Sequence, residues 1–128
     1  DKGITIKIRE MPEKLRRAAG FFDEESKIIY VNINDSLTRQ NFTIAHELGH
    51  YILKHPATDY GVRIRFPEIN AGDDIEKEAN CFAANLLVPE QMLKDIMKRY
   101  SLKKEDVPIL AQMFGVSTIV MNYRLSRV

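Results

Sequence analysis

All three histidines of this 128-residue chain lie between positions 46 and 55. Two of them stand in the sequence HELGH at residues 46–50, which is an H-E-x-x-H pattern. The surrounding apolar periodicity predicts a helix over residues 37–53. Residues four apart on a helix lie one turn apart on the same side, so both imidazoles can reach one metal ion. The pattern therefore requires a helix here, and a second element that covers its histidine side.

The apolar residues of this predicted helix favour a ligand role for the histidines. They are Leu37, Ile44, Leu48 and Ile52. On a helical wheel they gather roughly opposite His46 and His50, so both histidines lie off the main apolar stripe. This placement argues against histidines that serve only to fill the core.

A zinc site that can catalyse a reaction needs a third protein ligand and one open position. His55 stands directly before Pro56 and is not an obvious ligand, so we expect a carboxylate from another element. The candidates, Glu76 and Glu78, belong to a second predicted helix that ends near residue 87. The helical wheel places Glu76 nearer the centre of that helix's apolar stripe. We therefore choose Glu76, while Glu78 fits an ordinary acidic residue that stabilises the first helical turn.

Two further polar residues have candidate roles around the ion. Glu47 points about 100° away from His46 on the wheel, beside the expected open position, where a carboxylate can take a proton from water and pass it to a leaving amine. Asn80 lies four residues after Glu76 and could accept the ring N–H of a ligating histidine. A plain polar residue on the flank of the helix explains Asn80 equally well.

Strand patterns fill most of the chain before the predicted HELGH helix. Residues 3–9 alternate between apolar and polar, and residues 27–33 are rich in β-branched and aromatic side chains. Residues 15–22 fit either a strand or a helical turn, and residues 62–66 could add a short strand. We expect an α+β fold in which a small antiparallel sheet packs against the HELGH helix.

The last third of the chain is predicted to be helical. A third helix opens at Pro89 and reaches about residue 100, and two short helices then meet at Gly115. We expect residues 1–88 to form the core and residues 89–128 to form a helical subdomain packed on it. The final pair resembles a helix-turn-helix, but its second helix carries basic residues only late, at Arg124 and Arg127. Packing, or docking of a partner protein, is therefore expected in place of DNA binding.

Charge and composition exclude several classes of protein. Nineteen basic residues face eighteen acidic ones, so the net charge is +1, which is not typical of a strongly DNA-binding domain. The apolar runs fall far short of the roughly 20 residues that a membrane span needs. A single cysteine, Cys81, cannot form an intrachain disulfide and fits a reducing compartment. We expect a cytoplasmic protein.

Several sequence runs resemble the ImmA/IrrE family of bacterial and phage metallopeptidases. They are RQNFTIAHELGHYILKH and EKEANCFAANLLVP, with IIYVNIN upstream and LAQMFGVSTIVMNYRL downstream. The resemblance implies a zincin-like core with one Zn²⁺ ion, held by two histidines and a glutamate, and a second glutamate as the base. On this chain these are His46, His50, Glu76 and Glu47, although the choice of Glu76 over Glu78 depends on the helical wheel.

The resemblance also implies a substrate. Members of the family are thought to cleave helix-turn-helix transcriptional repressors and so relieve repression. We therefore expect a zinc-dependent endopeptidase that hydrolyses a peptide bond in such a repressor. The alternative is a non-catalytic, zinc-containing regulatory module of a phage, mobile element or toxin–antitoxin system that acts by binding a protein. Three protein ligands with an open position would favour the enzyme, and four protein ligands would favour the module.

Overall fold

The computed structural model describes residues 3–11, 18–55, 62–65 and 74–128, and within them the fold is α+β, as predicted. Strands and helices follow one another as β1 (Thr5–Arg9), β2 (Gly20–Asp23), β3 (Ile28–Asn32), α1 (Leu37–Ile52), β4 (Val62–Arg65), α2 (Asp74–Leu87), α3 (Glu90–Arg99), α4 (Val107–Phe114) and α5 (Thr118–Leu125). The predicted helices and the strands near residues 3–9 and 27–33 are confirmed to within a few residues. Of the ambiguous stretch 15–22, residues 15–17 lie outside the described part of the chain, and a strand begins at Gly20.

The four strands form one sheet in the order β1-β3-β2-β4. β2 pairs antiparallel with both β3 and β4, but β1 runs parallel to β3. The expectation of a wholly antiparallel sheet was therefore wrong for the β1–β3 pairing. Alternation of apolar and polar residues predicts which face of a strand is buried, but it says nothing of strand direction. The β2–β3 hairpin occupies one edge of β3, and β1 then joins the edge that remains.

α1 packs on one face of this sheet, over a small apolar cluster of Phe22, Ile29 and Val31. Gly20, on β2, lets the helix and the neighbouring strand come close. A Cβ atom at this glycine would lie 2.5 Å from the carbonyl oxygen of Tyr30 and 2.7 Å from Cγ2 of Thr43, which belongs to α1. The distance between α1 and the sheet therefore depends on the missing side chain of Gly20.

Replacing Gly20 with Ala is expected to lower the free energy of unfolding by about 1–3 kcal/mol, as is typical of overpacking. Part of the overlap is with a backbone carbonyl, which cannot rotate away. The measurement is urea unfolding of the purified chain. In the double variant Gly20→Ala/Thr43→Ser, residue 43 no longer has the Cγ2 atom that the new methyl group would meet. Its loss of unfolding free energy should be smaller than the sum of the losses in the two single variants. Wild-type stability of the single variant would contradict this account.

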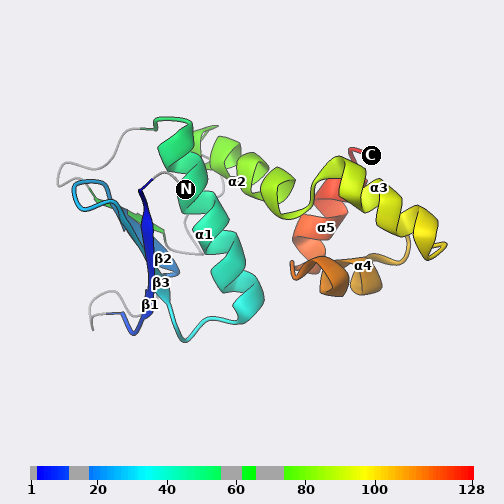
Figure 1. Ribbon diagram of the computed structural model, residues 1–128, viewed down its shortest axis with the longest axis horizontal. Helices are drawn as coiled ribbons and strands as arrows, with labels where there is room; N and C mark the ends of the chain where they lie inside the picture. The colour runs from blue at the N-terminus through cyan, green and yellow to red at the C-terminus, as the bar shows by residue number, and fades with distance from the viewer. Residues whose placement is uncertain (1–2, 12–17, 56–61, 66–73) are drawn as a thin grey trace.

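Figure 1 shows α1 lying between the sheet and α2, so this helix is covered on two sides. The predicted apolar stripe is not the part that is most buried: Leu37 is 75% exposed, whereas His46, Glu47 and His50 are almost completely inaccessible. The histidines lie off the apolar stripe, as the wheel indicates, and a second element covers their side of the helix, as expected. A wheel that ranks residues by hydrophobicity cannot identify a buried face that is polar. Buried polar groups of this kind are stable only with partners.

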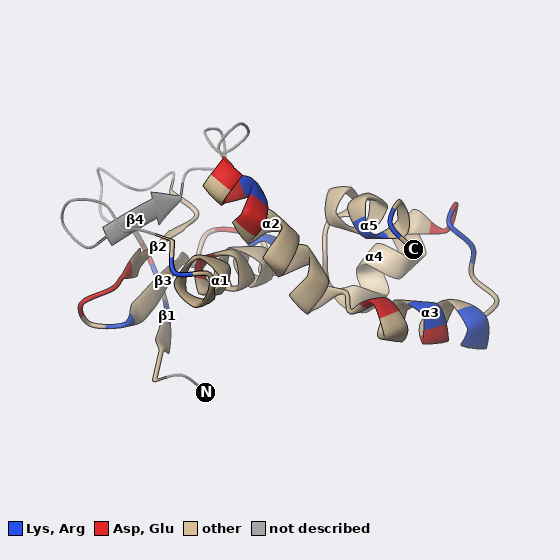
Figure 2. Cartoon of the chain, turned by 90° about the horizontal axis from the view of Figure 1, so that it is seen from above, with Lys and Arg blue, Asp and Glu red and all other residues tan. Residues whose placement is uncertain are grey.

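Small residues bring α1 and α2 together. Ala79 and Ala83 of α2 are completely buried, and a Cβ at Gly49 of α1 would lie 3.0 Å from Cδ1 of Phe82. Figure 2 shows that the charged residues of α2 gather near its N-terminal end, while the rest of the helix carries none. The close packing therefore sets the acidic end of α2 against the histidine side of α1.

The C-terminal helices share a second apolar cluster. Its buried members are Val88, Leu93, Leu110, Ala111, Val116, Met121 and Leu125. Gly115 ends α4 in a left-handed conformation, and the Ser117 side chain accepts the backbone N–H of Val120 at the start of α5. Arg124 is buried, and its Nε–H donates to the Val88 carbonyl. The domain boundary at residues 88/89 stays a prediction. Across the described residues, every helix is too short or too polar to cross a membrane.

Candidate metal centre

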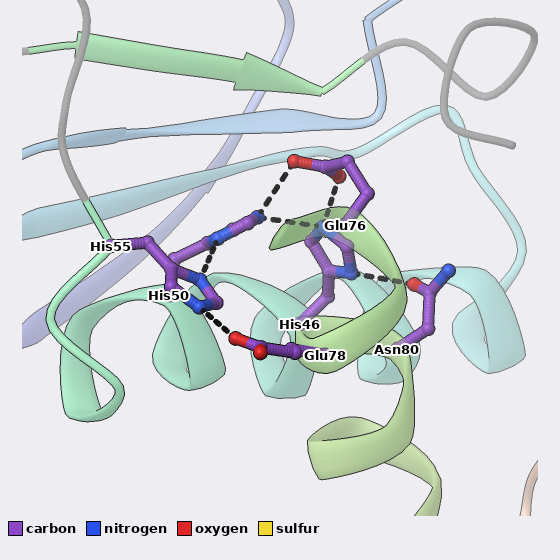
Figure 3. Close-up of polar contacts among 6 residues, drawn as sticks. All are labelled: His46, His50, His55, Glu76, Glu78 and Asn80. Atoms are coloured by element: carbon purple, nitrogen blue, oxygen red, sulfur yellow. Dashed lines mark hydrogen bonds and ion pairs between the residues drawn. The ribbon is translucent and has the colours of Figure 1, made fainter. Parts of the chain in front are cut away.

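Figure 3 shows His46, His50 and Glu76 converging between α1 and the first turn of α2. The His46 Nε2 lies 2.9 Å from Oε1 of Glu76, and the His50 Nε2 lies 3.1 Å from Oε2 of the same carboxylate. The two Nε2 atoms are 3.1 Å apart. One potential ligand atom from each residue falls within 4.8 Å of the others. The structure thus brings together the three residues that the sequence analysis chose as ligands.

Asn80 contacts the opposite side of the His46 ring. Its Oδ1 lies 2.8 Å from Nδ1 of His46. A carbonyl oxygen can only accept, so the Nδ1–H of His46 donates to Asn80, and Nε2 is the ring atom that faces the cluster. Of the two roles considered for Asn80, the contact with His46 is the one that the structure shows.

The carboxyl group of Glu76 is ionised at neutral pH. Burial raises the pKa of Glu76, but hydrogen bonds and positive charge from His46 and His50 outweigh that effect and hold the pKa well below its usual range. An ionised carboxylate and two imidazole nitrogens therefore face one another in a largely buried space. A divalent cation could bind these nitrogen and oxygen atoms in place of the protons between them. The three side chains therefore fit a metal ion.

Glu47 follows His46 on α1 and is completely buried. It is not among the three ligand-type residues that converge. Glu78, the rejected ligand candidate, also lies outside the cluster, and its side chain is 64% exposed.

His55, which was set aside as a ligand, has contacts at the site that the sequence did not predict. Its Nδ1 lies 2.9 Å from Nδ1 of His50, and its Nε2 lies 2.7 Å from Oε1 of Glu78. Glu78 is therefore more than an isolated first-turn acid, because it contacts a histidine that in turn contacts a ligand-type histidine. The signal was a third histidine just past the predicted end of the helix, but the position of His55 depends on how α1 terminates.

A pocket of about 400 Å³ adjoins the centre, between α1, α2 and α5. Its walls include Phe42, Ala84, Val120 and Tyr123. Asn80 also lines the pocket, and the Phe42 ring centroid lies 6.0 Å from that of His46. Of the C-terminal helices, α5 thus contributes to the wall of this pocket, and Asn80 lies between the pocket and His46.

An H-E-x-x-H helix packed on a small sheet, with a carboxylate supplied by the next helix, defines a metallopeptidase of the zincin type. The chain belongs to the peptidase M78 family, described as the IrrE N-terminal-like domain, whose sequence profile matches residues 1–126. Membership confirms the resemblance noted from the sequence and makes the chain a metallopeptidase domain.

Two named relatives illustrate the family. The metallopeptidase ImmA of Bacillus subtilis is 30% identical over 129 residues, covering 95% of this chain and 71% of the relative. The radiation response metalloprotease IrrE of Deinococcus deserti is 28% identical over 128 residues, covering 97% of this chain and 43% of the relative. The chain therefore spans less than half of the second relative's length.

A solved structure, a Mycobacterium tuberculosis transcriptional regulator, superposes with a TM-score of 0.68 at 20% sequence identity. The alignment covers 98% of this chain and 37% of that one. At this identity the likeness shows a shared fold.

Proposed function

We propose that this chain is a zinc-dependent endopeptidase in which His46, His50 and Glu76 hold one Zn²⁺ ion and Glu47 is the general base. The observation that carries the proposal is the convergence of two buried imidazoles and an ionised carboxylate within 4.8 Å. Two nitrogen ligands and one oxygen ligand are a typical set for catalytic zinc. When bound, the ion supplies Lewis acidity, which polarises a carbonyl and acidifies water.

The protein's own part in the reaction falls to Glu47. Its side chain is completely buried, and in surroundings of low dielectric an ionised carboxylate interacts more strongly with a nearby proton. We assign it the transfer of a proton from the attacking water to the leaving amine. Asn80 holds the His46 ring in the orientation that directs Nε2 to the ion.

The contacts of His55 favour an enzyme over a structural zinc module. Both ring nitrogens of His55 face other residues, His50 on one side and Glu78 on the other. Within the described ranges, the ligand-type cluster has three members and His55 is not among them. Three protein ligands leave room for water and substrate, as hydrolysis requires.

For the substrate, we propose a helix-turn-helix transcriptional repressor. The support is the family to which the chain belongs. A repressor acts on DNA, so the enzyme would meet it in the cytoplasm, and the single free thiol of Cys81 fits that compartment. We propose a protein, and not DNA or a membrane, as the partner.

The test is incubation of the zinc-loaded chain with the repressor encoded beside its gene, with and without a chelator. Loss of the intact repressor only in the sample without chelator is the expected result. Unfolded casein serves as a second substrate. Cleavage of casein but not of the repressor would contradict the proposed substrate and support the proposed endopeptidase activity. If neither protein is cleaved by a chain that holds one zinc ion, the proposed endopeptidase activity is wrong.

A further inference from the structure

The C-terminal end of α1 places His55 beside the candidate metal centre. Lys54, just past the last residue of the helix, has a φ of 60°, in the left-handed region. Its backbone N–H donates to the Tyr51 carbonyl, and the His55 N–H donates to the His50 carbonyl. These two bonds form a Schellman motif, which brings the residue after the left-handed position against the residue that accepts its N–H. The side chains brought together here are those of His55 and His50.

We propose that His55 and Glu78 are a positioning pair that holds His50 in the tautomer and orientation needed to bind the metal ion. The proposal rests on the proposed metal site and adds two residues to it. The pair itself is defined by the two short contacts, 2.9 Å between His50 and His55 and 2.7 Å between His55 and Glu78.

The direction of each hydrogen bond follows from the carboxylate. An ionised Glu78 can only accept, so the Nε2–H of His55 donates to it. A neutral His55 then has a lone pair on Nδ1, which accepts the Nδ1–H of His50. With Nδ1 protonated, His50 is left with Nε2, the atom that faces Glu76 and His46, as the nitrogen that can bind a metal ion. One exposed carboxylate therefore sets the tautomers of two buried rings.

The pair also couples the metal site to the packing of α2. Three polar residues of α2 stand two positions apart along the helix, and each has a different contact. Glu76 contacts the two ligand histidines, Glu78 contacts His55, and Asn80 contacts His46. Each ligand histidine thus has its own orienting group, and both groups depend on α2. Docking of α2 on α1 places the third ligand and orients the other two at once.

The test measures Zn²⁺ affinity by competition with a chromophoric chelator. His55→Ala is expected to weaken zinc binding by about 10–100-fold, as is usual for partners of ligand histidines. His55→Gln offers an amide oxygen to His50 and an amide N–H to Glu78, and should recover part of that loss. Glu78→Gln should weaken binding less than His55→Ala. Asp74→Asn, which removes a charge one turn earlier on α2, is the matched control and should bind zinc like the wild type.

A second readout needs no metal. Nitrogen NMR of the metal-free chain, at a pH about two units above the ordinary histidine pKa of about 6.5, reports which ring nitrogen carries the proton. In the wild type we expect a proton on Nδ1 of His50, held by the contact with His55, whatever Nε2 carries beside Glu76. In His55→Ala we expect a smaller fraction of chains with Nδ1 of His50 protonated. This measurement stays informative even if the chain proves not to be a zinc peptidase.

Two results would overturn the positioning pair. One is wild-type zinc affinity together with an unchanged His50 tautomer in His55→Ala. The other is a loss of zinc binding in His55→Ala as complete as that in His46→Ala, which would make His55 a ligand. Glu78→Gln changes a mostly exposed side chain, so it should fold normally and carry the test if the His55 variants do not.

Discussion

Glu47→Gln should keep the fold and one bound zinc ion per chain, yet hydrolyse peptide bonds about 10²–10⁴-fold more slowly than the wild type. Glutamine has nearly the shape of glutamate but cannot take a proton from water at neutral pH. The rate is measured as initial cleavage of casein or of the repressor, and the metal content by elemental analysis.

Parallel measurements separate a missing base from a damaged site. Zinc affinity and the thermal midpoint of Glu47→Gln should match the wild type, because Glu47 is not among the ligand-type residues of the described chain. Undiminished cleavage by a zinc-loaded variant would show that Glu47 is not the base. Loss of the metal together with activity would instead make Glu47 a contributor to binding.

The second large effect is expected from Glu76→Gln. The amide is neutral, so the attraction between an ionised oxygen and a divalent ion is lost. Zinc affinity should fall by more than the roughly 10–100-fold expected when an orienting partner is removed. Chelator competition measures this fall, and the rise in thermal midpoint on adding zinc should shrink with it, because only a ligand that binds the native state stabilises it.

Glu78→Gln is the matched control for Glu76→Gln. Both changes replace glutamate with glutamine in the first part of α2, two residues apart. Zinc binding should suffer much more at Glu76, whose two oxygens face the two histidines, than at Glu78, whose contact is with His55. An equal loss in both variants, or a larger loss at Glu78, would contradict the choice of Glu76.

Local patterns predicted most of the secondary structure. α1 and α2 could be predicted because their signals are local. The apolar period, the Ser36 side chain that accepts the Arg39 N–H, and the acidic residues in the first turn of α2 all act within a turn or two. The parallel β1–β3 pairing was not predicted, since it joins segments more than 20 residues apart that carry no signal of direction. The wheel identified the apolar stripe of α1, but not that the side with His46, Glu47 and His50 is buried more completely, because hydrophobicity scales count these residues as surface residues.

The amino-acid sequence by itself determined that His46 and His50 could share a ligand target, because the four-residue spacing of HELGH is a property of any helix. It also narrowed the third ligand to two glutamates on one helix. The helical wheel favoured Glu76, but only the tertiary structure places its carboxylate at the two histidines, since the small residues at the α1–α2 contact set how closely α2 approaches. The same packing turned Asn80 toward His46 and, with the left-handed Lys54, brought His55 back over His50. Spacing along a helix is local geometry, whereas these contacts depend on how distant segments pack.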